Sequence, residues 1–98
     1  MRIVARLEDV DFEWDSEKAE FNLEKHGVDF IDAMQVFLDP FVVYLDSHGI
    51  EDEPRSAAIG LNYSLNLLLV VHTERDDYIR IISARTPTRH ERRLYEER

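Results

Sequence analysis

The feature that most constrains the fold is a strand that leads directly into a capped helix. Apolar and acidic residues alternate over positions 10–15, which is the period-two pattern of a strand with one buried face. Asp15 or Ser16 then provides a helix cap, and Gly27 can take the left-handed conformation that ends a helix. The sequence therefore predicts a strand followed immediately by a helix over about 16–26.

The rest of the chain predicts an α+β fold with a mostly antiparallel sheet, two N-terminal helices and one C-terminal helix. Asp29 caps the second helix, whose apolar stripe ends at Asp39-Pro40. Thr88 and Glu91 form a capping box for the last helix, of about ten residues. Strands are expected, in addition, over the apolar or alternating segments 3–7, 41–45, 55–61, 67–73 and 78–84, of which the last two form a hairpin.

Composition limits the class of protein. A chain of 98 residues fits a single domain, and 44% hydrophobic with 34% charged residues is typical of a globular fold rather than a disordered one. There is no cysteine, which excludes disulfides and thiolate metal sites, and no apolar stretch is long enough to cross a bilayer. The N-terminus lacks the plan of a signal peptide, so we expect a cytoplasmic protein without a membrane partner.

The charge is strongly asymmetric along the chain. The formal net charge is −9, which at first sight argues against nucleic acid as a partner. Residues 80–98, however, hold six Arg against three Glu, while residues 1–79 hold six basic and 18 acidic side chains. The acidic part could bind a basic partner, or it could simply keep the protein in solution.

Arg80 and Arg85 are the leading candidates for a site that handles phosphate. A guanidinium is always charged, and its fork of donors matches a phosphate or a developing phosphorane. Five residues separate the two, so in an unbroken strand they point to opposite faces. They share a site if a bulge intervenes or if Arg85 lies beyond the strand, and the alternative is that one or both pair with surface carboxylates.

Five further residues could take part in proton transfer or charge stabilisation. Glu53 and Arg55 flank Pro54 and could act as proton acceptor and phosphate clamp, although an exposed acidic loop has the same composition. His72 ends an apolar strand, where a core histidine is the commoner case. Lys25 and His26 end the first helix, where the helix dipole alone can explain positive groups.

Three arginines of the last helix complete the candidate set, as a cationic surface that faces RNA phosphate or a partner: Arg89, Arg92 and Arg93. The alternative is a solvated helix face. The four histidines show no paired metal-ligand spacing, and the three glycines stand alone rather than in a phosphate-binding loop. We therefore predict no metal and no cofactor.

The motifs of this chain closely resemble those of the BrnT family over residues 12–97. The resemblance rests on Phe12-Glu13-Trp14-Asp15, Lys18-Ala19, Asn22-Leu23, Lys25-His26-Gly27-Val28, Phe30, Ala33, Phe37-Leu38-Asp39-Pro40, Arg55, Ile59-Gly60, Val70-Val71, Thr73-Glu74-Arg75, Ile79-Arg80-Ile81-Ile82-Ser83-Ala84-Arg85, Glu91-Arg92 and Tyr95-Glu96. Residues 1–11 precede the matched motifs, as an N-terminal extension or an extra strand of the single domain 1–98.

The resemblance implies a RelE-like fold and the toxin of a bacterial type II toxin-antitoxin system. Such a toxin is a metal-independent endoribonuclease that stops growth. It is held inactive in a hetero-oligomer with a BrnA-like ribbon-helix-helix antitoxin, through which the complex binds operator DNA.

RNA cleavage by the 2′-hydroxyl needs a base, an acid and cations. The base could be Glu53 or His72, and the acid could be Lys25 or His26. The cations could be Arg80 together with Arg55 or Arg85. The alternative function is a non-catalytic module that binds its partner and acts only in operon repression.

Overall fold

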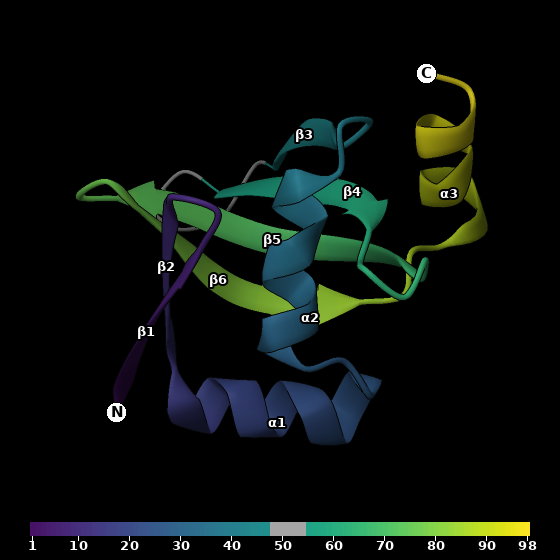
Figure 1. The fold of residues 1–98 in the computed structure, drawn as a ribbon. Helices are drawn as coiled ribbons and strands as arrows, with labels where there is room; N and C mark the ends of the chain where they lie inside the picture. The colour runs from purple at the N-terminus through teal and green to yellow at the C-terminus, as the bar shows by residue number, and fades with distance from the viewer. Residues whose placement is uncertain (48–54) are drawn as a thin grey trace.

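The computed structural model describes residues 1–47 and 55–98 (Figure 1). Its strands are β1 (Arg2–Leu7), β2 (Val10–Asp15), β3 (Val43–Ser47), β4 (Arg55–Leu61), β5 (Leu67–Arg75) and β6 (Tyr78–Arg85). Its helices are α1 (Ser16–His26), α2 (Phe30–Gln35), the short 3-10 helix η1 (Val36–Leu38) and α3 (Arg89–Glu96).

Within these residues the strands form one sheet in the order β1-β2-β6-β5-β4-β3. Neighbouring strands are antiparallel except for β2 and β6, which run parallel. The hairpins β1–β2 and β5–β6 turn through Glu8-Asp9 and Asp76-Asp77, all four of which have positive φ. Two such residues in a row form the tight turn whose twist matches that of the flanking strands. The α+β fold with a mostly antiparallel sheet is confirmed.

The two faces of the sheet carry separate apolar clusters. On the α2 face, helix α2 lies across the sheet (Figure 1), and Phe12, Trp14, Phe30 and Val70 are among the buried residues of the larger cluster. The α3 face has a smaller cluster at one end, where Tyr95 of α3 packs with neighbours that include Ile59 and Leu69. The remainder of the α3 face is where the charged residues of the central strands gather, and it holds the candidate site.

The helix ends follow the predicted capping residues. Asp15 accepts a hydrogen bond from the backbone N–H of Lys18, and Gly27 ends α1 with φ of 71°. Asp29 accepts from the N–H of Ile31 at the start of α2, and Thr88 with Glu91 forms the complete capping box of α3. Both N-terminal helices and the C-terminal helix are therefore present as expected.

Two predicted boundaries are wrong. The sequence predicts a second helix that continues to Leu38, but this helix tightens into η1 before Pro40, which disfavours helical backbone at the residue before it. The strand expected over 41–45 instead begins at Val43. The side chain of Asp39 accepts from the N–H of Phe41, and its carbonyl accepts from the N–H of Val42, so these residues are held in a turn.

Asp39 also ties α3 to the sheet. Its Oδ2 atom accepts hydrogen bonds from the hydroxyl of Tyr95, at 2.6 Å, and from the backbone N–H of Leu61. Gly60 lies beside this contact, and a Cβ there would come within 3.0 Å of Val36 Cγ1 and 3.2 Å of Asp39 Oδ2. Glycine at this position therefore lets η1 approach β4.

Candidate functional site

An open cleft with a volume of about 630 Å³ lies between α1 and the α3 face of the sheet. Helix α1 places Lys25 and His26 in its last turn, and both side chains are exposed. Arg55 reaches the cleft from the first position of β4, and Ser83 from β6. The complete lining is Asp15, Glu17, Lys18, Phe21, Asn22, Lys25, His26, Arg55, Ile82 and Ser83.

Buried Asn22 fixes α1 against β6 at this cleft. Its Nδ2 atom donates to the carbonyls of Val28, at 3.0 Å, and Ala84, at 2.9 Å, while its Oδ1 atom accepts from the N–H of Ala84 at 3.1 Å. The ladder between β2 and β6 pairs Phe12 with Ile79 and Glu13 with Arg80, so Ala84 lies beyond it. Asn22 therefore satisfies backbone groups that would otherwise be left at a strand edge.

A β-bulge in β6 decides which face its arginines occupy. Val71 pairs with Ser83 and His72 pairs with Ile81, which leaves Ile82 as an extra residue. Because of this shift Arg80 and Arg85 pair with residues four apart on β5, Thr73 and Leu69, and so share the α3 face. Of the two arrangements that the sequence left open, the bulge is the one present.

Arg80 lies beside this cleft rather than in its lining. Its Nη1 atom is 3.7 Å from Oε2 of Glu13, which is itself only 4% exposed. Oε1 of Glu13 accepts from Nε of Arg2 at 2.6 Å, so one buried carboxylate holds two guanidinium groups from two strands. The alternative predicted for Arg80 is pairing with a surface carboxylate, and the carboxylate beside it is instead a buried one.

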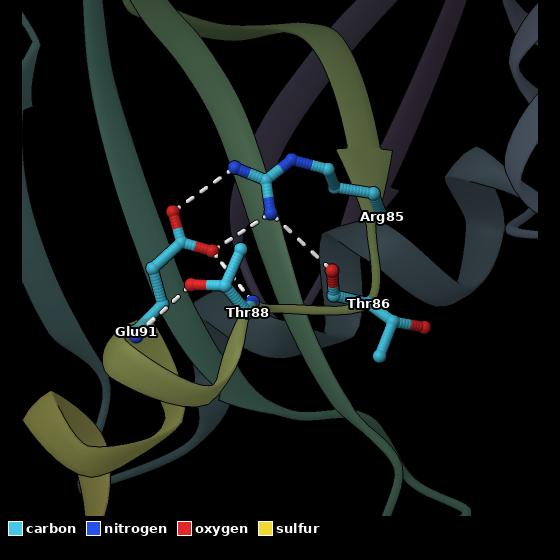
Figure 2. A network of polar contacts seen from close by, with 4 residues as sticks. All are labelled: Arg85, Thr86, Thr88 and Glu91. Carbon is cyan, nitrogen blue, oxygen red and sulfur yellow. Dashed lines mark hydrogen bonds and ion pairs between the residues drawn. The ribbon is translucent and has the colours of Figure 1, made fainter.

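Arg85 is bound to the start of α3 (Figure 2). Its Nη1 and Nη2 atoms donate to the two carboxylate oxygens of Glu91 at 2.7 and 3.0 Å, and Nη1 also donates to the Thr86 carbonyl. The N–H of Thr88 donates to the same carboxylate at 2.8 Å. Hydrogen bonds from Arg85 lower the pKa of Glu91 to about 2. This geometry supports a structural part for Arg85, and its catalytic role stays a prediction.

His72 lies on the opposite face from the arginines. It is 5% exposed, its ring packs edge-on against Phe37 at 4.8 Å between centroids, and Nδ1 lies 3.3 Å from the Val70 carbonyl. Burial lowers the pKa of His72, although the Val70 carbonyl acts in the opposite direction. The structure does not bring His72 together with the cleft, which matches the core histidine that the sequence offered as the commoner case.

The remaining predicted residues occupy two places. Arg89, Arg92 and Arg93 are exposed on α3, and Arg92 lines a hollow of about 270 Å³ to which His26 also contributes. Glu53 falls outside the described residues. No group of three or more possible metal ligands occurs among the residues that the structure describes, and none of the helices there could span a membrane.

Sequence reasoning missed several residues that build this region, notably Lys18, Phe21, Asn22 and Ser83. Asn22 carried a usable signal, because asparagine is a poor residue for the middle of a helix unless its side chain has a partner. Phe21 gave another, since it is apolar on a charged helix and is 65% exposed. Ser83 gave none, because its place in the cleft depends on the bulge.

Comparison with known proteins decides the family. A model of the family described as "Ribonuclease toxin, BrnT, of type II toxin-antitoxin system" matches residues 14–91. The chain belongs to the BrnT family. A search of curated proteins found no match.

A solved structure of a BrnT protein is also similar. It is the ribonuclease toxin BrnT of Brucella abortus, with 28% sequence identity and a TM-score of 0.58. The match covers 78% of this chain and 94% of the Brucella chain. Strand β1 precedes the residues that the BrnT family model matches, so Arg2 lies outside that model.

Proposed function

We propose that this BrnT-family chain is a metal-independent endoribonuclease that inhibits translation and growth in the cytoplasm. The observation that supports this best is the convergence of Lys25, His26 and Arg55 on one open cleft. The three residues come from two elements far apart in sequence, and the sequence alone makes each a candidate for RNA cleavage. A nucleotide-sized cleft with cationic groups and an exposed aromatic ring suits single-stranded RNA.

The proposed reaction is attack of a ribose 2′-hydroxyl on the neighbouring phosphorus atom. An imidazole nitrogen can accept a proton or donate one, so His26 is suited to proton transfer. Lys25 or Arg55 would stabilise the charge on the phosphorane oxygens, and the other would hold the phosphate. Arg80, on the same face, would bind RNA phosphate close to the scissile bond, and the arginines of α3 would extend the cationic surface.

We further propose that a BrnA-like antitoxin of the ribbon-helix-helix class neutralises the toxin in a hetero-oligomer. The acidic surface, with a net charge of −9, is complementary to a basic partner. Operator DNA would then be bound through the antitoxin. The alternative is a partner-binding module without catalysis, whose output is repression alone.

The test is induced expression in a bacterial host without antitoxin, followed by growth and by the integrity of total RNA. His26→Ala and Arg55→Ala should each lower cleavage about 100-fold or more, because each removes a proton-transfer or charge-stabilising group. His90→Ala removes an exposed histidine of α3 away from the cleft lining and is the matched control. Purified wild-type protein should retain cleavage in EDTA.

Normal growth and intact RNA with folded wild-type protein would favour the binding module instead. That module predicts operator binding with the partner present and no effect of the cleft substitutions on RNA. Loss of cleavage in EDTA, restored by a divalent cation, would contradict metal independence while leaving the ribonuclease proposal in place.

A further inference from the structure

A second hollow on the α3 face is lined by three arginines. It has a volume of about 240 Å³ and lies where β1, β2 and the β5–β6 hairpin meet. Arg2, Arg75 and Arg80 come from three different strands, and Glu13, Asp76 and Tyr78 complete the lining. Three guanidinium groups against two carboxylates give this hollow a local excess of positive charge in a chain whose net charge is −9.

Two of the three guanidinium groups, those of Arg2 and Arg80, are held in place before any ligand arrives. Buried Glu13 contacts Arg2 at 2.6 Å and Arg80 at 3.7 Å, and the Arg2 guanidinium also lies 5.0 Å above the centre of the Tyr78 ring. Each guanidinium has five N–H donors, so most remain available after these contacts. Fixing the donors in advance lowers the entropy cost of binding.

Arg75 supplies a third cation without holding the fold together. It is exposed at the end of β5, and it makes no ion pair within the part of the chain that the structure describes. Planar forks of this kind match the oxygens of a phosphate, with which arginine forms paired hydrogen bonds.

We propose that Arg2, Arg75 and Arg80 form a phosphate subsite that binds the RNA backbone beside the cleaved bond. The inference rests on the proposed ribonuclease function and adds a second point of attachment for the same strand. Arg80 and Ser83 are three residues apart on β6, which corresponds to roughly 10 Å of strand. One RNA strand can therefore reach both hollows on this face, whereas a single phosphate cannot. Because Arg2 lies on β1, the subsite depends on a strand that the family model does not match.

The test measures binding of a fluorescent RNA oligonucleotide whose 2′-hydroxyls are methylated, so that it is not cleaved. Arg2→Ala and Arg75→Ala should each weaken binding about tenfold, because each removes a charge-assisted hydrogen bond to phosphate. The dependence of log affinity on log salt should also become shallower by about 0.7 for each phosphate that is no longer neutralised. Arg6→Ala is the matched control: it removes the same charge from β1, from a residue paired with Asp9 and Asp11.

Two further measurements separate the possible outcomes. Cleavage of a longer RNA should fall more than cleavage of a trinucleotide in both variants, because the trinucleotide is too short to reach the subsite. Inorganic phosphate should compete only weakly with the oligonucleotide, since it cannot also occupy the cleft.

Equal RNA affinity and salt dependence in the two variants and in Arg6→Ala would overturn the subsite. That holds even if inorganic phosphate binds to the wild type, because the hollow would then take a free anion rather than RNA. If Arg2→Ala unfolds because Glu13 loses a partner, the RNA affinity and salt dependence of Arg75→Ala alone decide whether the subsite exists. Wild-type protein that binds RNA at the subsite but never cleaves it would defeat the proposed function and leave only the binding of RNA phosphate by the three arginines.

Discussion

Asn22 is unusual for a helix residue, because its side-chain amide makes backbone hydrogen bonds that a neighbouring strand would otherwise make. It bonds both the N–H and the carbonyl of Ala84, where β6 runs beyond its pairing with β2. Replacing it leaves two backbone groups in a buried site without partners, which costs more than the hydrogen bonds themselves are worth.

Asn22→Ala should therefore lower the free energy of unfolding by about 3 kcal/mol. Urea denaturation of the wild type and the variant measures the change. The control is Leu23→Ala, at the next position on α1, where the side chain is 47% exposed and the cost should be below about 1 kcal/mol. Equal losses in the two variants would mean that the amide contributes nothing specific.

At the scale of elements, an ion pair helps to hold α3 to the sheet. Arg85 and Glu91 link the end of β6 to the first turn of α3, and Glu91 also completes the capping box (Figure 2). The folded-state pKa of Glu91, about 2, is below its ordinary value of 4.5. The unfolded chain therefore binds the proton more readily, and this contribution is present above pH 4.5 and lost as pH falls toward 2.

Glu91→Gln should cost about 1 to 2 kcal/mol at pH 7, a figure reduced for the partial exposure of the pair to solvent. The difference between variant and wild type should shrink as pH falls from 4.5 toward 2. Urea denaturation at a series of pH values gives both results. A difference that does not change with pH would show that the ion pair contributes little and that the capping geometry carries the effect.

Most elements were predictable because their signals are local. Caps at Asp15, Asp29 and Thr88 act within one turn of each helix, and the alternation of apolar residues marks the strands. The start of β3 was not predictable from its aromatic and β-branched residues, since the turn made by Asp39 competes for them. That competition depends on contacts with β4 and α3, which are distant in sequence.

The candidate site was predictable in its residue types and less so in its arrangement. Lys25, His26 and Arg55 were named from the sequence, and the fold places them around one cleft. The sequence could not assign His72 to the other face. It also could not reveal that Glu13 of β2 holds Arg80, because strand order across the sheet brings them together.

At the scale of the whole molecule, one face of the sheet carries the larger core and the other carries the candidate site. The α2 face holds the larger core, in which Trp14 is 4% exposed and packs edge-on against Phe30 at 5.9 Å. The α3 face collects arginines from the cationic segment 80–98, because the bulge turns Arg80 and Arg85 toward it and α3 packs on it. Stability and the proposed activity should therefore respond to different substitutions.

Trp14→Ala should lower the free energy of unfolding by ~3 kcal/mol or more, since it opens a cavity in the core. Lys25→Ala should change stability by less than about 0.5 kcal/mol and still reduce RNA cleavage, because its side chain is exposed in the cleft. Thermal denaturation and the cleavage assay on both variants test the division. A folded but inactive Trp14→Ala variant would contradict it.

The extra residue in β6 also decides which face of the sheet each half of this strand presents. Deleting Ile82 would restore strict alternation and keep Arg80 and Arg85 on the α3 face, because the two arginines would then be four residues apart. If Ile82 stayed and paired regularly with β5 instead, with the end at Arg85 in place, Arg80 would point into the core beneath α2 and Ile81 would take its position among the charges. The way in which β6 pairs with β5, as much as the identity of its residues, therefore decides where its positive charge can act.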